Sequence, residues 1–274
     1  MNSTQLTRYL ARIDHPAAEA APATLSSLAA AHARSIPFEN LDAFVRRRVG
    51  LELAAVFDKL VLGCRGGWCF EQNLLFGEAL RALGFDVTDL AARVLWGRGP
   101  DAITPRTHRA LLVRAEGRDW LLDVGFGGQS ICGAIDLSRD DPQQVGHDVF
   151  RLEPLAAGER RLWVRIRGQW QPMYRFDLQP HLPVDFEAAN FQLCMDPASH
   201  FTQMLMLSRA TPDGRHVLRD FELGFHDPNG ATTRRVLRGP EEVLGVMEEF
   251  FGLKLDEEMR QAVSRKLSQR VQAG

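Results

Sequence analysis

The chain has 274 residues, of which 45% are hydrophobic and 25% charged, proportions close to those of ordinary globular proteins. A formal net charge of −2 at pH 7 provides no overall basic field, so we expect no nucleic-acid partner. Neither a signal peptide nor an apolar run long enough to cross a bilayer is found, which predicts a soluble, cytoplasmic protein without a membrane partner.

The first 84 residues have a helical pattern. Apolar residues recur every three or four positions over residues 4–13 and 24–34, and prolines separate these segments. Another helix is predicted over residues 69–83, where apolar side chains share a broad face and Gly84 provides a C-terminal stop. Cys69 therefore lies in the first turn of this helix.

From residue 85 to about residue 177 the pattern changes to short strand-like segments. They are separated by Gly, Pro or charged clusters, and this arrangement predicts an antiparallel sheet or a small barrel. The predicted strands cover residues 91–96, 108–113, 120–124, 150–155, 163–166 and 173–176.

The remaining segment mixes strands and helices. Strands are predicted at residues 201–208 and 234–237, a helix begins at Pro240 and ends at Gly252, and a last helix starts after Asp256. We find no internal repeat and no low-complexity linker, so we expect the segments to pack into one compact body.

A thiol stands in an informative position in the stretch RGGWCFEQN, residues 65–73. Two glycines permit a tight approach of the chain, and a helix begins at Cys69. Unpaired N–H groups and the positive end of the helix dipole favour a thiolate there, which is the form that attacks a carbonyl carbon. The same N–H groups can hold a developing oxyanion.

The cysteines also allow more ordinary interpretations. Free cysteine is commonly a small buried hydrophobe, and Cys132 and Cys194 are interpreted in that way. A zinc site at Cys64 and Cys69 is disfavoured because their spacing is not C-x2-C and no second pair exists, so we expect no metal. Four scattered cysteines do not make a disulfide framework, which predicts free thiols.

His108 and Asp123 lie on a predicted hairpin. With Glu116 and Gly117 as a two-residue loop, His108 faces Gly125 and has Asp123 as a diagonal neighbour; in a register two residues shorter, His108 faces Asp123 directly. Both registers place the two side chains on one face.

An aspartate in an apolar run is costly to bury without a partner, and the histidine supplies one. The carboxylate would hold the imidazole tautomer while the other ring nitrogen deprotonates Cys69. The alternative is a buried His–Asp pair that serves only the hairpin.

Residues 124–128, VGFGG, follow Asp123 directly. The segment matches neither a Walker phosphate loop nor a dinucleotide-binding fingerprint. Its glycines allow a close approach of a ligand to the backbone, so next to Asp123 it is interpreted as a wall for an acyl or aromatic group.

Taken together, these residues resemble the arylamine N-acetyltransferase family, and the resemblance covers nearly the whole chain. The similar blocks are IPFENLD (36–42), RGGWCFEQN (65–73), PRTH (105–108), DVGFGG (123–128), YRFD (174–177) and SHF (199–201). The first four of these blocks, ordered around a Cys, a His and an Asp, form a far more specific signal than any one block. Two departures, Trp68 in place of a frequent Tyr and the segment 191–194, bear on acceptor preference.

The resemblance implies an α+β fold in three parts. These are a helical bundle over residues 1–84 with the cysteine, a central antiparallel β-barrel over residues 85–190 with the His and Asp, and a C-terminal α/β lid over residues 191–274. The first two parts are implied to share the arrangement of papain-like cysteine enzymes.

The resemblance also implies a ping-pong transfer of acetyl from acetyl-CoA, as cosubstrate, to arylamines, arylhydrazines or N-hydroxyarylamines. Cys69 would carry the acetyl group, His108 would act as general base and then general acid, and Asp123 would orient His108. The implied substrate-binding residues are Phe38, Val94 and Phe126 along an aromatic pocket, with His200 and Phe201 near the cleft. The implied contacts of the pantetheine arm are Trp96, Thr107, Gly125 and Gly127.

Other functions are compatible with the same three residues. A thiol protease or amidase would complete the reaction with water, a transglutaminase-like enzyme would take its acyl group from a protein glutamine, and a binding protein would keep the geometry without turnover. The sequence leaves open the acceptor amine, the acyl chain length, the oligomeric state and any motion of the lid.

Overall fold

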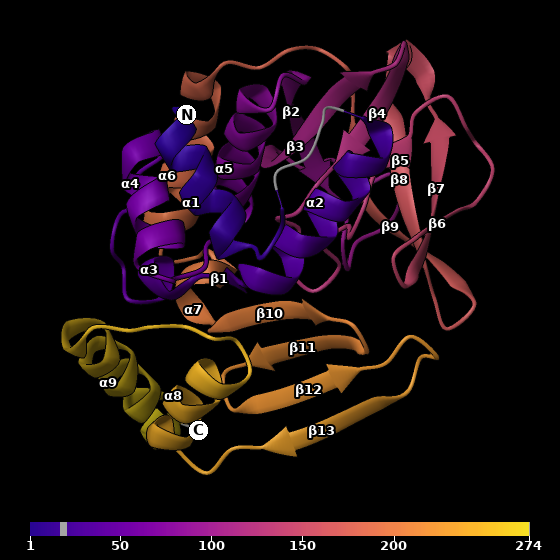
Figure 1. The fold of residues 1–274 in the computed structure, drawn as a ribbon. Coiled ribbons are helices and arrows are strands. Elements are labelled where there is room, and N and C mark those ends of the chain that lie inside the picture. Colours follow the sequence, from indigo (N-terminus) through magenta and orange to yellow (C-terminus); the bar gives the residue numbers. More distant parts are fainter. Residues whose placement is uncertain (17–20, 274) are drawn as a thin grey trace.

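Helices of the N-terminal third pack into a bundle on one side of the molecule (Figure 1). The structure, a computed structural model, describes residues 1–16 and 21–273, with side chains to residue 270. The helices are α1 (Ser3–Arg12), α2 (Pro22–Ser35), α3 (Leu41–Phe44), α4 (Leu53–Phe57), a π-helical turn (Asp58–Leu62) and α5 (Cys69–Ala82). Leu75 and Leu80 of α5 share one apolar core with Leu111 and Val113 of the central sheet, so α5 joins the bundle to that sheet.

The central sheet has eight strands in the order β5-β4-β3-β2-β9-β8-β7-β6 and curls into a nearly closed barrel. Its strands are β2 (Asp86–Val94), β3 (Arg106–Ala115), β4 (Arg118–Leu122), β5 (Ile135–Asp136), β6 (Gln143–Val145), β7 (Asp148–Pro154), β8 (Arg160–Ile166) and β9 (Gln169–Phe176). All seven neighbouring pairs are antiparallel. Inward-facing apolar residues such as Leu90, Leu121 and Leu162 fill its interior.

A second antiparallel sheet lies below the bundle and the barrel in Figure 1 and has the order β1-β10-β11-β12-β13. Its strands are β1 (Phe38–Glu39), β10 (Met206–Thr211), β11 (Gly214–Arg219), β12 (Glu222–His226) and β13 (Thr232–Val236). Helices α6 (Glu187–Met195) and α7 (His200–Gln203) precede β10, and α8 (Pro240–Glu249) and α9 (Glu257–Ala273) follow β13. Leu207 and Leu218 of this sheet share a core with Met247 of α8 and Val263 of α9.

The α+β fold class is confirmed, and most predicted elements appear within a few residues of their expected bounds. The first 84 residues are not wholly helical, because β1 pairs with β10 through Phe38 and Ser208. The four strands β5, β6, β11 and β12 were not among the predicted elements. None of the helices in the described ranges is long and apolar enough to span a membrane.

The strand predicted at residues 201–208 is wrong over its first half. Phe201 lies in α7, and the strand begins only at Met206. The physical reason is a distant side chain: Asn40 donates to the carbonyls of Phe201 at 2.8 Å and Met204 at 2.7 Å and accepts from the N–H of Met206 at 2.7 Å. Asn40 thus satisfies backbone groups that a strand would have paired with a neighbour.

Candidate active site

Cys69 is the first residue of α5 and is 8% exposed. Trp68 is the N-cap residue in extended conformation, and Gly84 follows the helix with φ +94°, as predicted for its stop. The Cys69 thiol therefore stands at the end of the helix where backbone N–H groups lack intrahelical partners.

The hairpin that carries His108 has the first of the two expected registers. Leu111 pairs with Leu122 and Ala115 with Arg118, so Glu116 and Gly117 form a two-residue loop. Their φ angles are +50° and +73°, and two successive positive φ values are the geometry of a type I′ turn. The ladder ends at Leu122, one residue before Asp123.

A β-bulge lies directly before His108. Ala92 pairs with His108 and Arg93 with Arg106, which leaves Thr107 without an opposite residue on β2. A bulge bends a strand and redirects its side chains. The thiol of Cys69 lies 3.9 Å from the carbonyl oxygen of Thr107, so the bulge brings β3 against the start of α5.

His108 and Asp123 are buried and form a hydrogen bond with each other. The distance from His108 Nε2 to Asp123 Oδ2 is 2.6 Å, and the two side chains are 3% and 0% exposed. Burial alone would lower the pKa of His108, but the nearby Asp123 carboxylate and then Cys69 outweigh burial and raise this pKa to about 10. The arrangement therefore favours a charged imidazolium between an acid and a thiol.

Asn73, which follows Cys69 by one helical turn, was not singled out from the sequence. Its side-chain amide donates to Asp123 Oδ1 at 2.9 Å and to the Arg109 carbonyl at 2.6 Å, and its oxygen accepts from the Val124 N–H at 3.1 Å. The sequence signal that could have identified Asn73 is its polar side chain at the i+4 position from Cys69, on a helix with a broad apolar face.

Gly125 packs directly on the backbone of Cys69. A Cβ atom at this position would lie 2.7 Å from Cys69 Cα and 3.1 Å from Asn73 Nδ2. The N–H of Gly125 also donates to Asp123 Oδ1 at 3.1 Å. Glycine is thus required here by close contact of two backbones.

Two groups of aromatic rings lie near Cys69 and His108. Phe126 is 5.2 Å from the His108 ring and 6.0 Å from that of Trp96, measured between centroids. In the second group Phe38 is 6.3 Å from Phe201, and Phe201 is 5.3 Å from Trp68, the residue before Cys69. Four of the side chains predicted as binding residues, Phe38, Trp96, Phe126 and Phe201, therefore come together in two aromatic groups.

The remaining predicted residues lie close to these groups. Val94 pairs with Tyr174 in the barrel, and Tyr174 lies 5.1 Å from the His108 ring. A Cβ atom on Gly127 would lie 3.5 Å from the Phe38 ring. His200 is exposed and adjoins Phe201, with ring centroids 3.9 Å apart, and burial of part of the ring together with Arg98 and Arg219 lowers its pKa.

Metal ligation finds no support in the geometry. Within residues 1–16 and 21–273 no group of three or more His, Cys, Asp or Glu side chains has an arrangement that could hold a metal ion. All four cysteines are free thiols in the structure.

Comparison with known proteins gives consistent matches. The model of a family described as N-acetyltransferase matches residues 23–260. The arylamine N-acetyltransferase of Escherichia coli K12 is 40% identical over 92% of this chain and 90% of that protein, and that of Mycolicibacterium smegmatis is 40% identical over 85% of each. The crystal structure of a Mycobacterium smegmatis arylamine N-acetyltransferase variant superposes with a TM-score of 0.92 at 36% identity over 98% of both chains. The Mycobacterium marinum enzyme in complex with CoA gives 0.92 at 32% identity over 96% of this chain and 98% of that one.

Proposed function

Because the chain belongs to the arylamine N-acetyltransferase family, we propose that it transfers an acetyl group from acetyl-CoA to an arylamine, an arylhydrazine or an N-hydroxyarylamine by way of a thioester on Cys69. His108 and Asp123 complete the catalytic machinery in this proposal. The observation that most strongly supports this proposal is the hydrogen bond of 2.6 Å between His108 and Asp123, beside the Cys69 thiol.

In the first half-reaction the Cys69 thiolate attacks the thioester carbonyl of acetyl-CoA. A bond forms between Sγ and the carbonyl carbon, and the bond from that carbon to the sulfur of CoA breaks. The His108 imidazolium gives its proton to the departing CoA sulfur. Backbone N–H groups at the start of α5 stabilise the oxyanion that forms in between.

In the second half-reaction the acceptor amine attacks the acetyl group on Cys69. Neutral His108 takes the proton from the amine nitrogen, and Cys69 leaves as a thiolate, which restores the starting state. Asp123 holds Nε2–H of His108 throughout, so Nδ1 is the nitrogen that exchanges protons.

The acceptor is proposed to bind between the two aromatic groups. Phe38 and Phe201 of one group lie near Cys69, and Phe126 of the other lies near His108; their flat apolar faces suit an aromatic ring. Val94 and His200 are assigned to the same pocket. The pantetheine arm is assigned to Trp96 and Thr107, with the backbone at Gly125 and Gly127, because these adjoin His108 and Phe126.

Incubation with acetyl-CoA in the absence of amine tests the proposal. We expect intact mass to increase by one acetyl group, peptide mapping to place it on Cys69, and an added arylamine to remove it as the acetylated amine. Label on another residue, or none, would contradict the proposal. Release of acetate by water at the same rate with and without amine would indicate a hydrolase instead.

Three points stay predictions. These are the division of the chain at residues 84 and 190, the cytoplasmic location, and the absence of nucleic-acid and membrane partners.

A further inference from the structure

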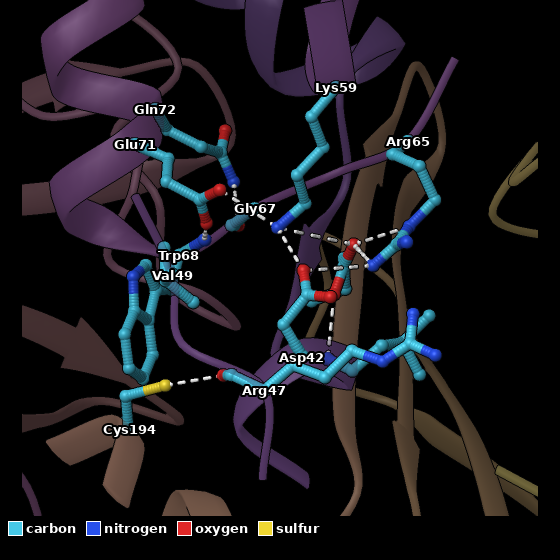
Figure 2. Close-up of polar contacts among 12 residues, drawn as sticks. Asp42, Arg47, Val49, Lys59, Arg65, Gly67, Trp68, Glu71, Gln72 and Cys194 are labelled. Atoms are coloured by element: carbon cyan, nitrogen blue, oxygen red, sulfur yellow. Dashed lines mark hydrogen bonds and ion pairs between the residues drawn. The ribbon is translucent and has the colours of Figure 1, made fainter. Parts of the chain in front are cut away.

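The peptide bond between Gly67 and Trp68, which leads into α5, is held at both of its polar ends. Its carbonyl oxygen accepts a hydrogen bond of 2.8 Å from Gln72 Nε2, and its N–H donates a hydrogen bond of 3.2 Å to Glu71 Oε2. Figure 2 shows both side chains pointing back from the first turn of the helix toward this peptide. Glu71 and Gln72 are 2% and 1% exposed, so water does not compete for these bonds.

Glu71 is itself fixed by a cation. Lys59 Nζ lies 2.8 Å from Glu71 Oε1 and 2.6 Å from Asp42 Oδ2 (Figure 2). Burial would lower the pKa of Lys59, but Glu71 and the other carboxylates of this cluster outweigh burial and raise it, so the amine stays charged. A buried carboxylate with one oxygen on an ammonium and the other on a backbone N–H has little freedom to rotate.

Gln72 is fixed by a second chain of hydrogen bonds. Its Oε1 lies 3.1 Å from His32 Nε2, and His32 Nδ1 lies 2.8 Å from the hydroxyl of Tyr9. Burial lowers the pKa of His32 to about 3, so the ring is neutral and has one donor and one acceptor nitrogen. With Tyr9 donating to Nδ1 and Nε2–H donating to Gln72, the amide of Gln72 is left to face the Gly67 carbonyl.

The backbone at this point leaves no room for a side chain at Gly66 or Gly67. A Cβ atom on Gly67 would lie 2.7 Å from Glu71 Oε2, and one on Gly66 would lie 2.2 Å from the Pro37 carbonyl oxygen. The Gly67 carbonyl also accepts from the Glu39 N–H at 3.1 Å, which ties the peptide to β1.

We infer that Glu71 and Gln72 are positioning residues for Cys69, which they serve by fixing the plane of the Gly67–Trp68 peptide. Rotation of that plane changes the dihedral angles on either side of it and so turns the Cys69 N–H, a donor at the start of α5. An oxyanion is stabilised only by donors that lie about 2.7–3.1 Å from its oxygen, so a small turn weakens acyl transfer. The inference rests on the proposed function, because it assigns these residues to acetylation of Cys69.

Two reactions of the same thiol separate positioning from other effects. Acetylation by acetyl-CoA passes through an oxyanion, whereas alkylation by iodoacetamide displaces iodide at a saturated carbon and forms none. In Glu71→Ala and Gln72→Met, we expect the acetylation rate constant per folded molecule to fall at least about tenfold and that of alkylation to change by less than about threefold. Glu71→Gln keeps an acceptor for the Trp68 N–H and should recover part of the lost acetylation.

Glu78→Gln is the matched control. Glu78 is a carboxylate on the same helix. It is paired with Arg81 at 2.9 Å and with the N-terminal amine at 3.2 Å, rather than with the Gly67–Trp68 peptide. Both rate constants should stay at the wild-type value in this variant. Thermal unfolding of each variant gives the folded fraction. If Glu71→Ala does not fold, the inference is tested with Gln72→Met alone.

Equal losses of acetylation and alkylation, or acetylation within about threefold of wild type in folded Gln72→Met, would overturn the inference. Failure of the proposed function is recognised separately, because wild-type Cys69 would then acquire no acetyl group at all.

Discussion

Asn73 and Asp123, 50 positions apart in the sequence, are joined by a hydrogen bond of 2.9 Å from the Asn73 amide to Asp123 Oδ1. The helix that begins at Cys69 is thereby connected to the residue that holds His108. The distance between thiol and imidazole thus depends on this amide as well as on the strands.

Replacing Asn73 with Ala should impair both stability and acetylation. The change removes a donor to a buried carboxylate and leaves the Val124 N–H without its acceptor, and each such loss costs about 1–3 kcal/mol. We expect acetylation per folded molecule to fall at least about tenfold. Asn190→Ala is the control, since Asn190 is also buried and donates to the Val49 carbonyl at 2.9 Å. Equal acetylation in the two variants would remove Asn73 from the positioning of Asp123.

Asp123→Asn should give a folded protein with severely reduced acetylation, by about a thousandfold or more. The asparagine keeps an oxygen for Asn73 and Gly125 but can present an N–H to His108 Nε2, which reverses the tautomer. Single-turnover acetylation followed by mass spectrometry measures the effect. Near-normal rates would exclude Asp123 from the mechanism.

Cys69 should react with iodoacetamide faster at neutral pH than Cys132 and Cys194. The His108 ring beside it has a pKa of about 10, so it is charged at neutral pH and stabilises a thiolate. By contrast, burial raises the pKa of Cys132 to about 11 and also raises that of Cys194. Peptide mapping after timed alkylation at neutral pH gives the three rates, and equal rates would contradict this expectation.

Gly125→Ala should destabilise the site, whereas Gly128→Ala should be tolerated. The added Cβ would lie 2.7 Å from Cys69 Cα in the first variant but 3.7 Å from the Val217 side chain, an ordinary contact, in the second. Overpacking against a backbone typically costs about 1–3 kcal/mol. Denaturant unfolding gives the two free energies, and acetylation should fall only in Gly125→Ala. A similar free energy in both variants would show that the backbones can separate.

His32 should make the wild-type protein sensitive to mild acid. The pKa of His32 is lowered by burial to about 3 in the folded state, against an ordinary value of 6.5 for histidine, so the unfolded chain takes up a proton first as the pH falls. The stability contribution is complete above pH 6.5 and is lost below it, by up to about 1.4 kcal/mol per pH unit. His32→Gln lacks this titration. Unfolding free energies measured between pH 4 and pH 8 should therefore fall less steeply in the variant, and parallel curves would contradict the assignment.

Local sequence patterns were enough to predict the helix and the hairpin that carry Cys69 and His108. The start of α5 at Cys69, its stop at Gly84 and the two-residue loop at Glu116 and Gly117 depend on side chains and φ angles within a few residues, which the sequence displays directly. The period of two in a strand then placed His108 and Asp123 on one face.

Contacts between distant segments were decided only by the tertiary structure. The partner of Asn73, the packing of Gly125 on Cys69 and the departure of Phe201 from the expected strand involve residues 50, 56 and 161 positions apart. Periodicity and turn propensity carry no information at that range, because such contacts depend on which surfaces meet when helices and sheets pack. The sequence by itself thus determined which side chains could react, and packing decided how they are held together.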